Sequence, residues 1–113
     1  MKRRVSPWQV WIVDFDPQMG REQAGKRPAV IVASHMHCDL QTPVTLVIPL
    51  TRTQLPLGYR VPVRVPSSRQ QSYAITEQIT TVSHERLGER PLGKLDLSTV
   101  ARLRDALREM IDL

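Results

Sequence analysis

The sequence is poor in cysteine, and Cys38 is the single thiol among 113 residues. A lone cysteine cannot form an internal disulfide, so nothing points to an oxidising compartment, and the cytoplasm is the expected location. A chain of this length buries roughly two thirds of its unfolded surface in one core without a metal or a disulfide. We therefore expect one domain, spanning residues 1–113, that depends on hydrophobic packing.

Long apolar runs are also missing. The segment "MKRRVSPWQVWIVDFD" places basic residues before an apolar run, as a secretory signal does. Pro7 and Gln9 interrupt the run, Asp14 and Asp16 close it, and no small-residue cleavage site follows. No other run is long enough to span a bilayer, so we expect a soluble protein with no membrane partner.

Signatures of cofactor and triad chemistry are absent. The sequence contains no Gly-rich phosphate loop, no CxxC pair and no Ser-His-Asp spacing, so we expect no cofactor. The segment "HMHCD" (His35–Asp39) has residue types that suit zinc, but no second cluster completes a tetrahedral site, so no metal is expected. His84 falls in a polar turn and is expected to be solvated.

Basic residues outnumber acidic ones. Sixteen Lys and Arg against eleven Asp and Glu give a formal net charge of +5, and thirteen of the sixteen basic residues are Arg. Guanidinium groups form bidentate hydrogen bonds with phosphate oxygens, so this composition suits a nucleic acid or another acidic partner. A merely solvated basic surface would give the same composition. With five aromatic residues in all, extensive stacking on bases is not expected.

Hydrophobic periodicity predicts several short strands and then one helix. The strand-like runs are residues 8–15, 28–34, 44–50, 59–65 and 73–82. Pro62 cannot donate to a ladder, so the fourth run is expected at a sheet edge. From Val100 on, apolar residues recur with helical spacing, and Asp96 or Ser98 can cap this helix. This order predicts a mostly β (α+β) fold, a small bent antiparallel sheet or barrel with a C-terminal α-helix.

The segment "DPQMGREQAGKRPAVIV" joins the first two expected strands and holds a candidate active-site residue. Gly20 and Gly25 allow this loop to fold closely over a surface. Arg27 precedes a proline and is therefore held extended, so its guanidinium can be aimed from a rigid position, and Glu22 could pair with it. The alternative is an ordinary surface loop, whose screened ion pairs contribute little.

Other polar side chains follow or interrupt the apolar runs. Thr51, Arg52 and Thr53 come directly after the third expected strand, where their hydroxyl and guanidinium groups could face a ligand. Gln78 lies between apolar positions of the fifth run. Taken alone, Thr51 suits a turn and Gln78 suits a strand ladder.

With these motifs the chain resembles the MazF/PemK family of toxin endoribonucleases of bacterial type II toxin-antitoxin systems. The resemblance covers nearly the whole chain and rests on "WIVDFDPQMGREQAGKRPAVIV", "VIPLT" and "EQITTVSHERL", in this order. It implies a homodimer of small SH3-like barrels, of the CcdB, Kid and MazF kind, that cleaves single-stranded RNA at a short sequence without a metal ion. It also implies a cognate antitoxin, whose acidic, disordered C-terminal segment we expect to cover the basic groove.

The resemblance assigns roles to individual residues. Arg27 and Thr51 match the catalytic pair, and Glu22 matches the acidic residue that supports them. Cleavage would use the neighbouring 2′-hydroxyl as the nucleophile and leave a 2′,3′-cyclic phosphate and a 5′-hydroxyl. The expected RNA-binding residues are Gln23, Lys26, Arg52, Thr53 and Gln78.

Two alternatives from other functional classes stay open. One is a non-catalytic toxin of the CcdB type, because that group is expected to share the fold and fold alone does not decide function. The other is a catalytically silent RNA-binding barrel. The pair of Arg27 and Thr51 favours the nuclease, since a toxin that binds only protein has no need of a phosphate-directed arginine at this loop end.

Overall fold

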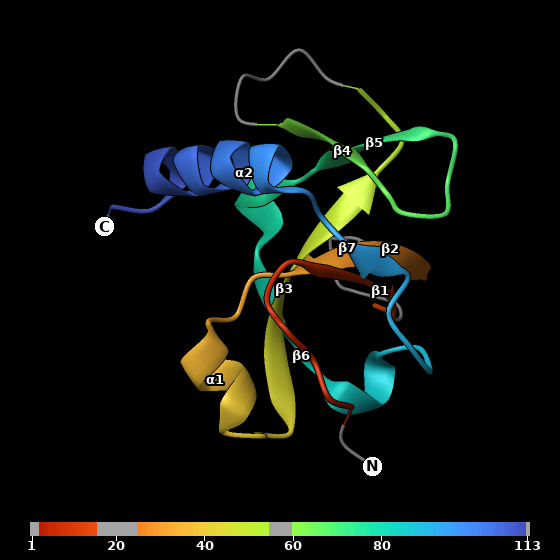
Figure 1. Ribbon diagram of the computed structural model, residues 1–113, viewed down its shortest axis with the longest axis vertical. Coiled ribbons are helices and arrows are strands. Elements are labelled where there is room, and N and C mark those ends of the chain that lie inside the picture. Colours follow the sequence, from red (N-terminus) through yellow and green to blue (C-terminus); the bar gives the residue numbers. More distant parts are fainter. Residues whose placement is uncertain (1–2, 16–24, 55–59, 113) are drawn as a thin grey trace.

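The computed structural model describes residues 3–15, 25–54 and 60–112, which form a curled β-sheet with a C-terminal helix (Figure 1). The strands are β1 (Gln9–Asp14), β2 (Lys26–Ile31), β3 (Val44–Thr51), β4 (Val61–Arg64), β5 (Gln71–Ala74), β6 (Thr80–Ser83) and β7 (Gly93–Lys94). The helices are α1 (His35–Asp39), α2 (Leu97–Met110) and two short 3-10 helices, η1 (Thr76–Gln78) and η2 (His84–Arg86). The predicted fold class is confirmed.

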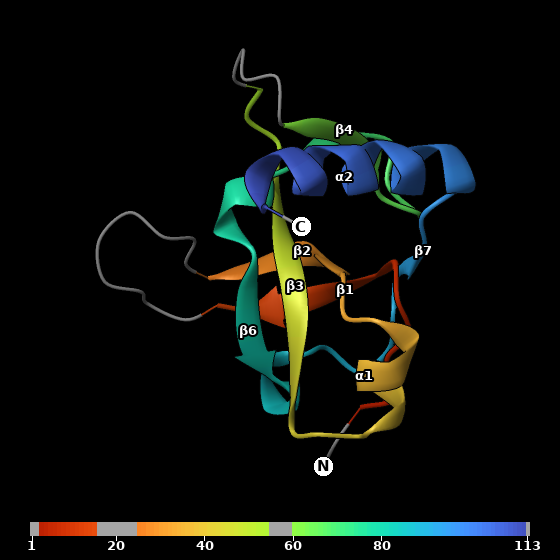
Figure 2. The same ribbon diagram turned by 90° about the vertical axis from the view of Figure 1, so that its left-hand side faces the viewer.

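All strand pairs are antiparallel, in the order β4-β5-β3-β2-β1-β7, and β6 also pairs with β3. The helix α2 lies across one end of the sheet, where it contacts β4 and η1, and α1 lies at the opposite end, beside the start of β3 (Figure 2). The strand β4 is an edge strand with an exposed Pro62, as predicted.

The strand β3 changes partner at Pro49, and this change positions the candidate site. Its earlier residues pair with β2 and β6, and the register with β2 ends where Ala29 lies opposite Pro49. Its last two residues, Leu50 and Thr51, pair with β5 instead. Because Pro28 lacks the N–H that would extend the ladder beyond Ala29, β2 and β3 stop pairing at this point.

Apolar side chains pack on both faces of the sheet. Val10 of β1 belongs to one buried cluster together with Leu103 of α2, while Trp11 and Val13 belong to a second cluster on the other side. The unbroken apolar run of β1 is therefore explained by burial of both of its faces. Each fully buried large apolar side chain contributes about 1.5–3 kcal/mol to folding.

The helix α2 begins at the predicted cap. The Asp96 carboxylate accepts the N–H of Thr99 at 2.8 Å, so Asp96 rather than Ser98 is the N-cap. A hydrogen bond from the Thr99 side chain, and then the one from its backbone, lower the pKa of Asp96. No helix among the described residues could cross a membrane, since α2 has 14 residues and about 20 are needed.

Two features differ from the sequence prediction. The fifth expected strand is divided into β5 and β6 by η1, a short 3-10 helix over Thr76–Gln78. The short helix α1 was not predicted, since none of its five residues is fully buried and they show no apolar periodicity. Ser34 caps it by accepting the N–H of His37 at 3.1 Å.

Candidate active site

Arg27 lies near the start of β2, in the part of the strand that pairs with β1. Val13 is its register partner, and Lys26 lies opposite Asp14. Pro28 follows, and its ring restricts the backbone of Arg27 as well as its own. Strand pairing and the proline ring together therefore hold the main chain of Arg27. The side chain is half-buried. A guanidinium is thus presented from a rigid strand start.

Thr51 is the last residue of β3 and exposes 9% of its surface. It pairs with Tyr73 of β5, and its hydroxyl oxygen accepts the N–H of Thr53 at 3.2 Å. A hydroxyl that accepts a hydrogen bond still carries its own proton, so Thr51 can donate to a ligand.

Strand register brings Arg27 and Thr51 toward each other. Ala29 lies opposite Pro49. Continuing this antiparallel register by two residues would place Arg27 opposite Thr51. Directly opposed residues direct their side chains to the same face. The ladder itself stops at Pro49, and a cavity of about 550 Å³ lies between the two strand ends, lined by both Arg27 and Thr51. We call this space the basic cavity.

The lining of the basic cavity is cationic and rich in hydroxyl groups. Lys26, Arg27 and Arg52 supply positive charge, and Thr51 and Thr53 supply hydroxyls. None of the described residues that line it is acidic. Charge-assisted hydrogen bonds from such groups favour an anion, and a phosphate suits them well. Five of the predicted site residues therefore meet in one place.

Sequence reasoning missed a further group of hydroxyls in the same cavity. Ser67 and Ser68 line it from the turn between β4 and β5, and the buried Ser72 lines it from β5. The polar run after Pro66 indicates a turn in the sequence. Nothing local indicates what that turn faces, because the opposite wall comes from strands far away in the chain.

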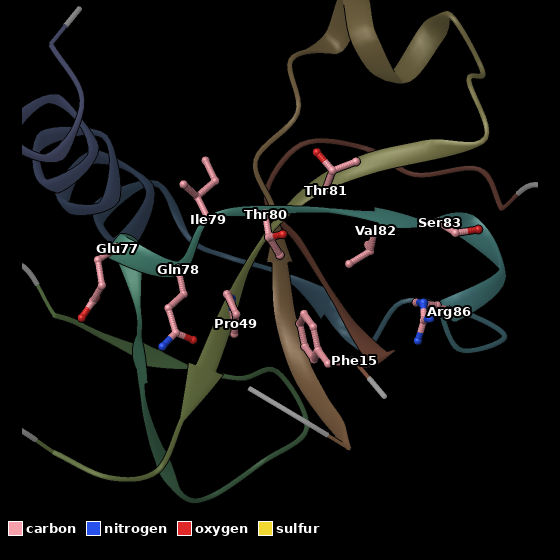
Figure 3. Close-up of a pocket in the computed structure, with 10 residues that line it drawn as sticks. All are labelled: Phe15, Pro49, Glu77, Gln78, Ile79, Thr80, Thr81, Val82, Ser83 and Arg86. Carbon is pink, nitrogen blue, oxygen red and sulfur yellow. The ribbon is translucent and has the colours of Figure 1, made fainter. Parts of the chain in front are cut away.

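Gln78 lies in η1 and lines a second cavity of about 320 Å³ (Figure 3). Glu77 and Gln78 stand at one end of this space, with Phe15 and Arg86 toward the other. The Glu77 carboxylate lies 3.7 Å from the guanidinium of Arg60. The expectation of a strand ladder at Gln78 is wrong, because η1 interrupts the strand, and the structure does not bring Gln78 into the basic cavity.

The remaining predicted site residues, Glu22 and Gln23, lie outside the described residues. Within the described ranges, no three His, Cys, Asp or Glu side chains are grouped as a metal ion would require. In α1, burial raises the pKa of the Cys38 thiol, and the charge of Asp39 raises it further. A raised pKa reduces the thiolate fraction, so Cys38 is a poor nucleophile.

The expectation that His84 is solvated is wrong. This residue exposes 4% of its surface, and its Nδ1 accepts the backbone N–H of Arg3 at 3.1 Å. The Arg3 side chain in turn donates to the carbonyl of Gly88 at 2.9 Å. The polar sequence around His84 does not reveal that the N-terminal segment covers it.

Comparisons with known proteins agree with one another. Residues 6–111 match the family described as PemK-like, MazF-like toxin of type II toxin-antitoxin system. The chain is 31% identical over 112 residues to the endoribonuclease MazF9 of Mycobacterium tuberculosis, which covers 93% of this chain and 94% of that protein.

Solved structures show the same likeness at the level of the fold. The MazF of Deinococcus radiodurans superposes with a TM-score of 0.84 at 16% identity, over 99% of this chain and 100% of that one. A mycobacterial endoribonuclease in complex with its cognate antitoxin gives a TM-score of 0.76 at 23% identity, over 96% of each chain. The predicted small antiparallel barrel with a terminal helix is thereby confirmed.

Proposed function

Because the chain belongs to the family of PemK-like, MazF-like toxins of type II toxin-antitoxin systems, we propose that it is an endoribonuclease toxin. Its single domain, residues 1–113, cleaves single-stranded RNA at a short sequence without a metal ion. The observation that carries this proposal is the basic cavity, which Arg27 and Thr51 line together. Relatives of the chain are named endoribonucleases, and the cavity offers the groups that such a reaction needs.

The proposed reaction uses the 2′-hydroxyl beside the scissile phosphate as the nucleophile. The attack is intramolecular, so the protein must hold the strand in line and stabilise the extra negative charge on phosphorus. Arg27 stabilises that charge, and the Thr51 hydroxyl donates to the same oxygens. The P–O5′ bond breaks as the P–O2′ bond forms. The 2′-hydroxyl gives up its proton to solvent water and the departing 5′-oxygen takes one up, which leaves a 2′,3′-cyclic phosphate and a 5′-hydroxyl.

Charge stabilisation is the role that suits an arginine here. Arginine side chains stay protonated in proteins and are poor general bases. A bidentate guanidinium matches two phosphate oxygens in geometry as well as in charge. Glu22, Gln23 and Gln78 are proposed as supporting and RNA-binding residues, in addition to the cationic and hydroxyl side chains of the basic cavity.

We also propose that the toxin acts as a homodimer in the cytoplasm and is neutralised by a cognate antitoxin. A structurally similar endoribonuclease is known in complex with its antitoxin. The net charge of +5 and the lack of acidic residues among the described lining of the cavity favour an acidic segment as the occupant. Such binding weakens with added salt. Antitoxin binding that is insensitive to salt, or that leaves RNA cleavage intact, would contradict this part of the proposal.

The test is cleavage of a mixed RNA pool in EDTA by the wild type and Arg27→Ala, followed by sequencing of the new ends. Loss of a charge-stabilising group costs about 10²–10³-fold in rate. We expect the wild type to cut at one short motif and Arg27→Ala to cut at least 100-fold more slowly. The matched control is Arg90→Ala, since Arg90 is an exposed arginine outside both cavities and should leave cleavage unchanged.

The 5′ ends of the cleaved RNA, together with RNA binding by the wild type, distinguish this proposal from its alternatives. New 5′-phosphate ends would require a different mechanism. RNA that binds to the wild type and stays whole would favour a silent RNA-binding barrel, and a wild type that neither binds nor cuts RNA would favour a CcdB-like toxin.

A further inference from the structure

We infer that the turn between β4 and β5 is a second substrate-binding element, in which the hydroxyls of Ser67 and Ser68 bind the phosphate next to the scissile one. This inference rests on the proposed RNA substrate and adds two residues that neither the motifs nor the sequence periodicity identified. It follows from the conformation of the turn, its place on the basic cavity and its hydrogen-bonding capacity.

The turn has a serine where the backbone favours glycine. The N–H of Ser68 donates to the carbonyl of Val65 at 3.0 Å and closes a four-residue turn. Pro66 occupies its second position and Ser67 its third, with φ of +66°. In turns of this pattern the third position is usually Gly or Asn, because other side chains are strained there. Backbone strain of this kind is often found at binding sites.

The turn forms one wall of the basic cavity. Pro66, Ser67 and Ser68 all line the space that Arg27 and Thr51 line from the other strands. Behind the turn lies Gly93 of β7, where an added Cβ would come within 2.6 Å of Pro66 Cγ. This close approach, together with the pairing of Gly93 with Val10 in β1, gives the turn a firm support.

Both hydroxyls can serve an anion. The Ser68 oxygen accepts the N–H of Gln70 at 3.2 Å and keeps its own proton to donate. The Ser67 hydroxyl donates to the carbonyl of its neighbour Pro66, and rotation about one bond exchanges this local contact for an external acceptor. None of the described lining residues is acidic, and this favours a phosphate there.

The basic cavity is large enough to hold a second phosphate beside the reacting one. About 550 Å³ is in the range of small-molecule pockets and is larger than one phosphate needs. Arg27 and Thr51 bind the scissile phosphate, which leaves Ser67 and Ser68 to bind the adjoining one. A flanking phosphate carries the same charge before and during the reaction. Its contacts therefore lower KM and contribute little to kcat.

The experiment compares Ser67→Gly, Ser67→Ala and Ser68→Ala with the wild type. It uses a short RNA containing the cleavage motif, and its 2′-deoxy analogue for binding. A hydrogen bond to a charged group corresponds to roughly tenfold in affinity. We expect each variant to raise KM, and Kd for the analogue, about tenfold, while kcat changes much less. Ser98→Ala is the control, an exposed serine of α2 outside the cavity, and should change neither constant.

Ser67→Gly makes the test decisive, because it removes the hydroxyl and also relieves the strain. We expect its Tm to rise by a few degrees although its KM becomes worse. A purely structural serine would instead give a more stable protein with unchanged KM and Kd, and this result would overturn the inference. Failure of the wild type to bind the 2′-deoxy analogue would also overturn the inference.

The nearest phosphate can be checked directly. Replacing the phosphate beside the scissile one with an uncharged methylphosphonate should raise the wild-type Kd, and Ser68→Ala should then add little further loss. Full additivity of the two changes would show that Ser68 does not contact that phosphate. If the wild type binds the analogue and does not cut RNA, the proposed nuclease function fails, while the Kd values still decide the role of the serines.

Discussion

Gly93→Ala is the substitution with the largest effect on activity expected outside the residues of the basic cavity. The new Cβ would lie within 2.6 Å of Pro66 Cγ and closer still to Pro66 Cβ. Carbon atoms in contact are ordinarily about 3.5–4.0 Å apart, so the turn must move by about 1 Å. Gly93 also has φ of +149°, a backbone conformation that L side chains rarely adopt. Strain of this kind costs about 1–3 kcal/mol.

Activity should fall because the turn is displaced from its position in the cavity wall. Misplacement by about 1 Å can cost up to about 100-fold in rate, and the serine contacts alone account for at least about tenfold. We expect kcat/KM of Gly93→Ala to fall between tenfold and 100-fold, mainly through KM. Tm should fall by roughly 10 °C. The assay is steady-state cleavage of a defined RNA, well below the Tm of the variant.

Two companion variants separate displacement from general damage. At Gly88 an added Cβ meets its nearest atoms at 3.6 and 3.7 Å, which is ordinary contact, so Gly88→Ala should keep both Tm and KM. Adding Pro66→Gly to Gly93→Ala removes the colliding ring and should recover part of the loss in KM. A folded Gly93→Ala protein with wild-type KM and kcat would refute the reasoning, because the support of the turn would then be irrelevant to substrate binding.

Two further predictions concern the stability of α2. Leu103 is fully buried, so Leu103→Ala should lower the free energy of unfolding by roughly 3 kcal/mol in chemical denaturation, and a change below 1 kcal/mol would contradict its place in the core. Asp96 has a lowered pKa in the folded state, so its cap stabilises the protein above the ordinary value of 3.8 and is lost as the pH falls through the lower folded-state pKa. The Tm difference between wild type and Asp96→Ala should therefore be present at pH 6 and disappear in acid, and a constant difference would exclude the charged cap as its cause.

Much of the local structure could be predicted from the sequence. The run around Val10 predicts a strand, the spacing from Val100 predicts the terminal helix, and Pro62 predicts an edge position, since each depends on residues a few positions apart. The burial of His84 could not be predicted in this way. It depends on the N-terminal segment, whose Arg3 lies 81 positions away in the chain.

For the candidate site, too, the local features could be predicted from the sequence and the long-range ones could not. By itself the sequence determined that an arginine stands before a strand proline and that a threonine directly follows the third expected apolar run, because strand and turn signals are local. Only the tertiary structure decided that Arg27 and Thr51 share a cavity, that the turn at Ser67 also lines it, and that Gln78 lines another. The physical reason is the change of partner at Pro49. Where β3 stops pairing with β2 and begins to pair with β5 depends on pairing between distant segments, and the end of the β2 ladder leaves the space that these segments line.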